Sequence, residues 1–406
     1  MSLLSRTLLL STCMLSLMLE AGAAQEPAAP DWHPVAEEIQ RLVRTHYIGE
    51  GGENWAFKYD VDTNMFKTDH KRFVEITKRR IGDLKMSHTG YYAPDDPEYY
   101  GLRAIFRETN QEKVEWDSIG ADFTPDGFVR VVFAGSPAAK AGLWRGDQVL
   151  KADGQIFHRV RSFQGKVEKQ VTLTVQREKD GTPITVNVTP RRINPKQEWL
   201  EAQIQGSRLI PHQGKTIAYV PMFSCAGEEY QQALRNAIIG ELQKADALIL
   251  DFRDGWGGAN PDFVNLFHRA TPVLTQTGRD GKEVRFDAQW RKPAFLLING
   301  GSRSGKEVVA YAVKKHKLGV LVGERTAGAV AGGRIFRLTD GSILYLAVAK
   351  VLVDGERLEG VGVEPDVVVK DDLRFANGRD VQLQNALDLA AKRGHLKALV
   401  NSRCPC

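Results

Sequence analysis

Apolar residues in the N-terminal part of the chain recur at the spacing of an amphipathic helix. They follow an i, i+3, i+4 pattern in two stretches between residues 35 and 85. The positions are Val35, Ile39, Leu42 and Val43 in the first stretch and Phe73, Ile76 and Ile81 in the second. We therefore predict two helices, preceded by an exposed leader at 25–34, within an N-terminal helical domain that spans residues 25–114.

The pattern changes to short β runs beyond residue 115. Strand-like segments separated by glycine and aspartate turns cover 127–133, 148–151, 171–175 and 184–188. A short helix is predicted between the first two, because Ser136 suits its N-cap and Pro137 its first position. We predict a compact β domain over 115–192.

Residues 193–375 alternate between strand and helix patterns. Nearly continuous apolar runs at 247–251 and 294–298 are typical of parallel strands buried on both faces. Further strands are expected at 216–220 and 319–323, and helices at 228–244 and 307–315. This order predicts an α/β core, followed by a closing helix and tail over 376–406. The fold class is thus α/β, in a multidomain chain.

The first 24 residues have the pattern of a signal peptide. Arg6 precedes an apolar run from Leu8 to Leu19, and Ala21-Gly22-Ala23 provides small residues for cleavage. We expect export to the periplasm or the extracellular space. No other run of 18 apolar residues occurs, so we expect no integral membrane span in the mature form.

Charge and cysteine content exclude several classes of function. The chain has 406 residues and a formal net charge of +5, with 55 basic and 50 acidic residues interspersed, which disfavours nucleic-acid binding. Histidines and cysteines show no zinc-ligand spacing, and we expect no metal or other cofactor. Cys225 is expected either to be free and buried or to pair with Cys404 or Cys406.

The segment Asn299–Glu307 carries the strongest chemical signal. It is rich in glycine and serine and lies between a buried strand and a helix, so a serine there can project from a sharp turn toward helix N–H groups. The same pattern also fits a phosphate site. The chain has no G-x-G-x-x-G after its first strand and no Walker lysine pattern, which disfavours that alternative.

Four blocks together extend this signal to a family. They are 248–253 with Gly257-Gly258, 299–307, 322–328 and 358–366. In sequence and order they resemble the C-terminal-processing (tail-specific) serine peptidases. The resemblance implies a ClpP/crotonase-like peptidase core, an internal PDZ domain at 115–192, and Ser304 as nucleophile, with Ser302 as the fallback.

The general base departs from the Ser–Lys members of that family. Ala329 stands at their lysine position, and Lys306 is only two residues from Ser304, a spacing that faces another way on a helix. The chain is more similar to the tricorn-like branch, in which a histidine serves. That resemblance implies His88 as base, with Ser87 and Glu359 supporting it. An imidazole suits this role because its pKa lies near neutrality.

The resemblance also implies an oxyanion hole formed by the N–H groups of Gly257 and Gly305. Glycine suits both positions because the backbone must approach the substrate closely. Trp256 replaces a small residue, and we expect it to narrow the site or to form an apolar wall.

The predicted PDZ domain would bind a peptide end at the loop made by Ile119, Gly120, Ala121, Asp122 and Phe123. Only 157–169 is available for the second helix of such a domain, and Gly165 interrupts it. Peptide binding and a purely structural role therefore both remain open.

Together these features predict a secreted serine endopeptidase that cleaves unfolded or tail segments of polypeptides through an acyl-enzyme. Two alternatives remain: a non-catalytic ligand- or peptide-binding scaffold on the same fold, and an adaptor that acts through the PDZ domain alone. An oligomer is possible. Because His88 and Ser304 belong to different predicted domains, domain closure is a possible gate of activity.

Overall fold

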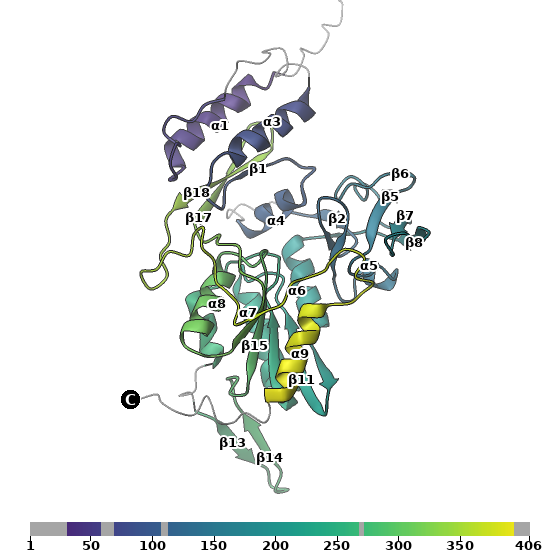
Figure 1. Cartoon of the computed structure of the whole chain (residues 1–406), viewed down its shortest axis with the longest axis vertical. Coiled ribbons are helices and arrows are strands. Elements are labelled where there is room, and N and C mark those ends of the chain that lie inside the picture. The colour runs from purple at the N-terminus through teal and green to yellow at the C-terminus, as the bar shows by residue number, and fades with distance from the viewer. Residues whose placement is uncertain (1–30, 58–68, 107–112, 268–271, 394–406) are drawn as a thin grey trace, which may run out of the picture.

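A computed structural model describes residues 31–57, 69–106, 113–267 and 272–393 (Figure 1). Two helices lie at one end of the molecule, a β-rich unit lies beside the α/β core, and a hairpin projects at the opposite end. The predicted signal peptide at 1–24, Cys404 and Cys406 lie outside the described residues.

The two predicted N-terminal helices are α1 (His33–His46) and α3 (His70–Gly82). Their apolar stripes are buried, and Asp69 caps α3 by accepting a hydrogen bond from the Arg72 N–H. The predicted leader ends too late, because α1 begins at His33 and the Trp32 ring stacks on Phe73 at 5.6 Å.

Helices α1 and α3 do not form an apolar core by themselves. Strand β1 (Gly90–Tyr92) pairs antiparallel with β18 (Ile343–Ala349), which pairs with β17 (Gly332–Arg337). Residues of α1 and α3 share one apolar cluster with Leu344, Leu346 and Ala347 of β18. The helical region and the segment 331–349 therefore pack as one unit, followed by α4 (Pro97–Ile105).

Residues 115–193 form the unit that we call the β module. Strand β2 (Trp116–Ser118) pairs with β9 (Arg191–Ile193), so the chain enters and leaves the module side by side. The other strands are β3 (Ala121–Phe123) with β4 (Val129–Val132), and a sheet in the order β6 (Gln155–Ile156), β5 (Gln148–Ala152), β7 (Val171–Gln176) and β8 (Ile184–Val188). The predicted short helix is α5 (Pro137–Lys140), capped by Ser136. Residues 157–169 form turns instead of a helix.

The core is built on a six-stranded sheet. Its order is β10 (Arg208–His212), β11 (Lys215–Pro221), β12 (Ala247–Asp251), β15 (Ala294–Ile298), β16 (Val320–Gly323) and β19 (Val367–Val368). Only the β10–β11 pair is antiparallel among these described strands. The two apolar runs predicted as doubly buried strands are β12 and β15, and every residue in them is buried.

Helices cover both faces of this sheet. One face packs against α6 (Pro195–Gly206), α7 (Glu228–Ile239), η1 (Glu241–Lys244), η2 (Pro261–Phe267) and α8 (Gly305–Lys315). The other face packs against α9 (Val381–Arg393), whose Ala386 and Ala390 contact the cluster around Ile249. Helix α9 is therefore part of the core and not a separate tail. A hairpin of β13 (Leu274–Thr277) and β14 (Glu283–Phe286) projects from the α/β core.

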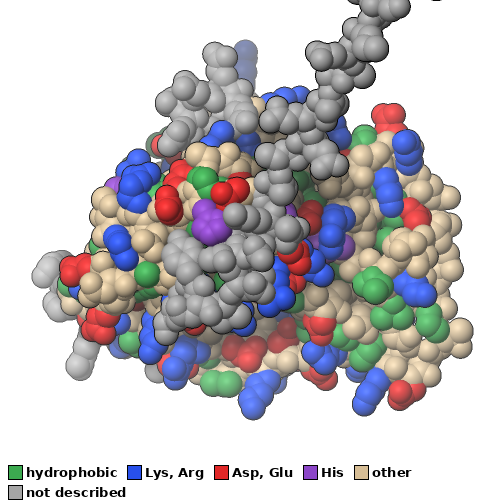
Figure 2. All heavy atoms as spheres, turned by 90° about the horizontal axis from the view of Figure 1, so that it is seen from above, with side chains coloured by type: hydrophobic (Ala, Val, Ile, Leu, Met, Phe, Trp, Pro, Cys, Tyr) green, Lys and Arg blue, Asp and Glu red, His purple; other side chains and the backbone are tan. Residues whose placement is uncertain are grey.

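Charged side chains of both signs share the described surface. Figure 2 shows acidic and basic side chains interspersed on the face seen there. Among the described residues, no helix combines the length and apolar character that crossing a membrane requires. The same part of the chain holds no cluster of His, Cys, Asp and Glu suited to a metal ion. Cys225 is buried and free.

Candidate active site

Ser304 lies between the end of β15 and the first residue of α8. Its backbone has φ 56° and ψ −129°, a conformation that residues with a side chain rarely adopt. Its N–H donates to the carbonyl of Ala329 at 2.8 Å and approaches Glu307 Oε2 at 3.2 Å. The surrounding loops thus hold a strained backbone at the predicted nucleophile, as many functional sites do.

Glu307 organises this turn from inside the protein. Its side chain is fully buried, and its oxygens accept hydrogen bonds from the Thr326 hydroxyl and the N–H groups of Gly328 and Ala329 at 2.6–2.8 Å. Burial raises the pKa of this carboxyl, and these hydrogen bonds oppose the rise. Glu307 was not among the predicted site residues, although Ser304 and Glu307 have the S-x-x-E spacing of a capping box.

Ser302, the fallback nucleophile, faces the interior. Its hydroxyl donates to the carbonyl of Phe252 at 2.8 Å and accepts from the N–H of Asn299 at 3.0 Å, and the residue is fully buried. Ser302 therefore holds the 299–304 turn against the strand end and is not placed to meet a substrate.

The structure brings His88, Ser87 and Glu359 together. The Ser87 hydroxyl lies 2.9 Å from His88 Nδ1 and donates to Glu359 Oε2 at 2.7 Å. The Ser87 N–H donates to the other oxygen, Oε1, at 2.8 Å. One carboxylate thus anchors both the backbone and the hydroxyl of Ser87, and through them the imidazole.

Glu359 is held in turn by the loop that follows Ala329. The N–H groups of Val330 and Ala331 donate to its Oε2 at 2.7 and 2.9 Å. Burial tends to raise the pKa of this carboxyl, but the hydrogen bonds from Ser87, Val330 and Ala331 outweigh burial and leave the pKa below its usual value. Glu359 is therefore ionised at neutral pH.

His88 is neutral in this environment. Burial lowers its pKa from 6.5 to about 4, the charge of Glu359 opposes this shift, and the nearby charge of Arg303 reinforces it. Arg303, which precedes Ser304, is thus within electrostatic range of the imidazole. No hydrogen bond joins His88 to Ser304 among the described residues.

Gly257 lies directly against Ser304. A Cβ at Gly257 would stand 2.5 Å from the Ser304 Cβ and 3.0 Å from the N atom of Gly305, so no larger residue fits. Neither the Gly257 N–H nor the Gly305 N–H donates a hydrogen bond within the described residues. Two unused donors therefore lie beside the Ser304 side chain.

Comparison with known proteins agrees with this geometry. Residues 216–369 match the model of peptidase family S41. In this chain, the segment 216–369 is a domain of peptidase family S41. The chain is therefore a serine-type peptidase, related to the carboxyl-terminal-processing proteases, and the predicted resemblance is confirmed at that level.

Two curated relatives show the extent of the similarity. A carboxyl-terminal-processing protease of Synechocystis sp. is 27% identical over 368 residues, which cover 86% of this chain and 80% of the relative. A carboxy-terminal-processing protease of Bartonella bacilliformis is 28% identical over 307 residues, covering 70% and 68%.

Two solved structures share the fold. The tricorn protease aligns with a TM-score of 0.50 and 19% identity, over 89% of this chain but only 36% of its own. A protein of Bacteroides fragilis described as an S41 protease aligns with a TM-score of 0.50 and 18% identity, over 87% and 97%. At these identities the likeness supports the mixed α/β fold alone.

Neither of the two positions considered for a lysine base offers an ammonium that is hydrogen-bonded to Ser304 in the described chain. Ala329 lies next to Ser304, where its carbonyl accepts the Ser304 N–H, but it carries only a methyl group. Lys306 points into the protein, and its Nζ donates to the carbonyl of Asp254 at 2.6 Å. His88 stays the predicted base.

A cavity of about 760 Å³ lies between the β module and the core of the S41 peptidase. Asp122 and Arg130 line it from the module, and Trp256 and Arg303 line it from the loops beside Gly257 and Ser304. The Trp256 ring lies 5.8 Å from that of Trp199. Trp256 thus contributes an apolar wall to the cavity, next to the predicted oxyanion hole.

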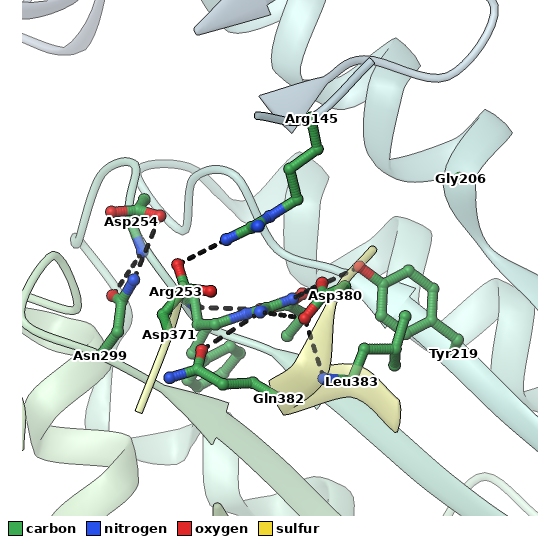
Figure 3. Close-up of polar contacts among 12 residues, drawn as sticks. Arg145, Gly206, Tyr219, Arg253, Asp254, Asn299, Asp371, Asp380, Gln382 and Leu383 are labelled. Atoms are coloured by element: carbon green, nitrogen blue, oxygen red, sulfur yellow. Dashed lines mark hydrogen bonds and ion pairs between the residues drawn. The ribbon is translucent and has the colours of Figure 1, made fainter. Parts of the chain in front are cut away.

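Buried ion pairs line the part of this cavity shown in Figure 3. The Arg253 guanidinium contacts Asp251 at 2.6 Å and Asp380 at 2.7 Å. Arg145, from the β module, reaches Asp371 of the core at 2.5 Å. The cavity is therefore bounded by contacts that link the module to the segment leading into α9.

The predicted peptide-binding loop is divided between two environments. The side chains of Ile119 and Phe123 are buried in the apolar core of the module. The Gly120 N–H donates to the Ser118 hydroxyl at 3.0 Å, whereas Ala121 and Asp122 line the cavity. Binding of a peptide end by this loop, and its assignment to a PDZ domain, stay predictions.

Proposed function

We propose that this S41 peptidase hydrolyses peptide bonds through an acyl-enzyme, with Ser304 as nucleophile and His88 as general base. The observation that carries the proposal is the chain of contacts from Glu359 through Ser87 to His88. Such a chain orients an imidazole and selects its tautomer, which is what a serine nucleophile requires of its base.

The polarity of that chain supports the assignment. Because the Ser87 hydroxyl donates to Glu359, its oxygen can accept a hydrogen bond from His88 Nδ1–H. The other ring nitrogen, Nε2, is then unprotonated and can take the proton of Ser304. It returns this proton to the leaving amine when the peptide bond breaks, and water later releases the acyl group by the same route.

In this proposal, the N–H groups of Gly257 and Gly305 form the oxyanion hole. Attack by Ser304 places a negative charge on the substrate carbonyl oxygen, and two preorganised N–H donors stabilise that charge. The close approach of Gly257 to Ser304 and to the Gly305 N atom supports this pairing.

The proposed substrate is an unfolded segment or the tail of a polypeptide. The cavity supports this inference, because it runs from the β module to Trp256 and Arg303 and offers both apolar and charged walls. The sequence pattern of residues 1–24 extends the proposal to an exported enzyme. Sequencing of the mature N-terminus after cell fractionation tests the location.

A serine-directed fluorophosphonate probe, combined with an assay on an unfolded protein substrate, tests the chemistry. The wild type should be labelled and cleave the substrate, whereas Ser304→Ala should do neither. Ser207→Ala is the matched control, because Ser207 lies at the end of α6. Folded wild-type protein that is neither labelled nor active would contradict the proposal and favour a binding scaffold.

A further inference from the structure

Lys306 is a buried lysine to which the reaction above assigns no role. It lies two residues after Ser304 on α8, with a relative exposure of 0%. Removing an ammonium group from water is costly, so a buried lysine needs compensating contacts. Its Nζ donates a hydrogen bond to the Asp254 carbonyl at 2.6 Å.

That carbonyl begins the turn that carries the predicted oxyanion hole. Asp254, Gly255 and Gly258 all have positive φ, at 50°, 67° and 88°. The turn between β12 and Gly258 is therefore sharply bent, and the direction of the Gly257 N–H depends on how firmly this bend is held.

Contacts on two sides hold the bend. A Cβ at Gly255 would lie 2.1 Å from the Phe223 carbonyl oxygen and 3.3 Å from Lys306 Nζ, so the chain passes closely between them. The Phe223 carbonyl accepts the Trp256 N–H at 2.9 Å. On the cavity side, Asn299 bonds to both the N–H and the carboxylate of Asp254 (Figure 3).

We propose that Lys306 is a positioning residue of the oxyanion hole: its ammonium holds the Asp254–Gly258 turn so that the Gly257 N–H meets the oxyanion. This inference rests on the proposed function for its catalytic consequence, but its structural part, the hold on the turn, does not. The ammonium also places a positive charge on this turn, which favours a transition state that carries negative charge there.

The surroundings of Lys306 make this hold sensitive to pH. Burial lowers its pKa from 10.5 to about 8; the charges of Asp251 and Asp254 oppose that shift, and Arg303 adds to it. The neighbouring Cys225 thiol, whose pKa burial raises to about 11, is neutral in this range. Lys306 is therefore charged at pH 7 and loses its proton as the pH rises through about 8. Wild-type activity should therefore fall as the pH rises above about 8.

Two variants separate the hydrogen bond from the charge. Lys306→Met removes both and suits a buried site, whereas Lys306→Gln keeps an N–H donor that does not titrate. Lys315→Met is the matched control, because Lys315 ends the same helix and pairs with Asp354 at the surface. Hydrogen exchange of peptides that cover 252–260 and kcat and KM between pH 6 and 10 are measured for all four proteins.

In Lys306→Met we expect exchange at the Trp256 N–H to accelerate about tenfold. We expect kcat to fall about 10- to 100-fold with KM within about twofold, and the alkaline limb near pH 8 to disappear. Lys306→Gln should retain part of the exchange protection and also lack the limb. Lys315→Met should match the wild type.

The proposal is overturned if Lys306→Met leaves both the exchange of the turn and the alkaline limb unchanged. It is also overturned if exchange accelerates equally across α8, because Lys306 would then stabilise the helix in general. If the wild type is inactive and Ser304 does not react with fluorophosphonate, the proposed function fails, while the exchange data still decide whether Lys306 holds the turn.

Discussion

Ser87 donates a hydrogen bond of 2.7 Å to Glu359, a residue 272 positions later in the chain. The two residues come from different parts of the molecule: Ser87 follows helix α3, and Glu359 lies in a loop that precedes strand β19. Their contact ties the N-terminal region to the α/β core at the place where His88 is held. The site therefore depends on the packing of these two regions as much as on its own residues.

Replacement of the buried carboxylate should disable the base. In Glu359→Gln, an amide nitrogen would face the N–H and hydroxyl donors of Ser87, Val330 and Ala331, and one oxygen would lose its acceptor role. We expect kcat/KM to fall by roughly 10²- to 10⁴-fold. Glu364→Gln is the control, because Glu364 is an exposed carboxylate nearby. Near-normal turnover in Glu359→Gln would contradict the role of Glu359.

Arg303 should tune the pH dependence of the base. Because the pKa of His88 is lowered to about 4, the wild type should lose kcat/KM only as the pH falls toward 4. Arg303→Gln removes a positive charge that lowers this pKa, so the acid limb should move to higher pH. Titration of the His88 imidazole by NMR should show the same shift, and an unchanged pKa would argue against contact between the two groups.

The strained backbone at Ser304 should be visible in stability. Since φ is 56°, Ser304→Gly relieves a conformation that Ser304→Ala retains. Both variants should lack peptidase activity, but the glycine variant should have a free energy of unfolding higher by about 1 kcal/mol. Denaturant titration measures the difference. Equal stabilities would mean that the backbone relaxes in the alanine variant.

The buried ion pairs around Arg253 should be essential to the fold near the cavity. Arg253→Leu leaves Asp251 and Asp380 buried without their cation and should lower the free energy of unfolding by about 3–5 kcal/mol at pH 7. Arg374→Leu, which breaks an exposed pair with Asp126, should cost less than about 1 kcal/mol.

The loss of stability in Arg253→Leu should depend on pH. Burial tends to raise the pKa of Asp380, but Arg253 outweighs burial and leaves the pKa below its usual value. The stability that this group contributes is present above its unfolded pKa and is lost as the pH falls through the folded value. The deficit of Arg253→Leu should therefore shrink in acid, and a deficit that is independent of pH would point to lost packing instead.

Local pattern predicted the elements that carry the site. The apolar runs at 247–251 and 294–298 form strands buried on both faces, because neither run has polar positions that would need a solvated side. The Gly-rich stretch after the second run leads into α8 as expected, since such a turn lets the chain reverse sharply into a helix.

Other features depend on which side of an element faces the interior. Helical spacing showed that Lys306 does not face the same way as Ser304, but not that its ammonium meets the Asp254 carbonyl. Glu307 has a capping-box spacing, yet its hydrogen bonds to Gly328 and Ala329 come from a loop some twenty residues away. A closing helix was predicted in the C-terminal part of the chain, but not that α9 covers one face of the sheet.

The sequence by itself determined the alternation of helices and strands around β12 and β15, the position of the Ser304 turn and the resemblance to a peptidase family, because short-range periodicity and contiguous motifs encode these features. Only the tertiary structure decided that β1 pairs with β18, that Glu359 supports Ser87, and that Lys306 lies beneath the turn of Gly257. Those contacts join segments far apart in the chain, and the free energy that selects them comes from burial and hydrogen bonding in three dimensions, which no local pattern specifies.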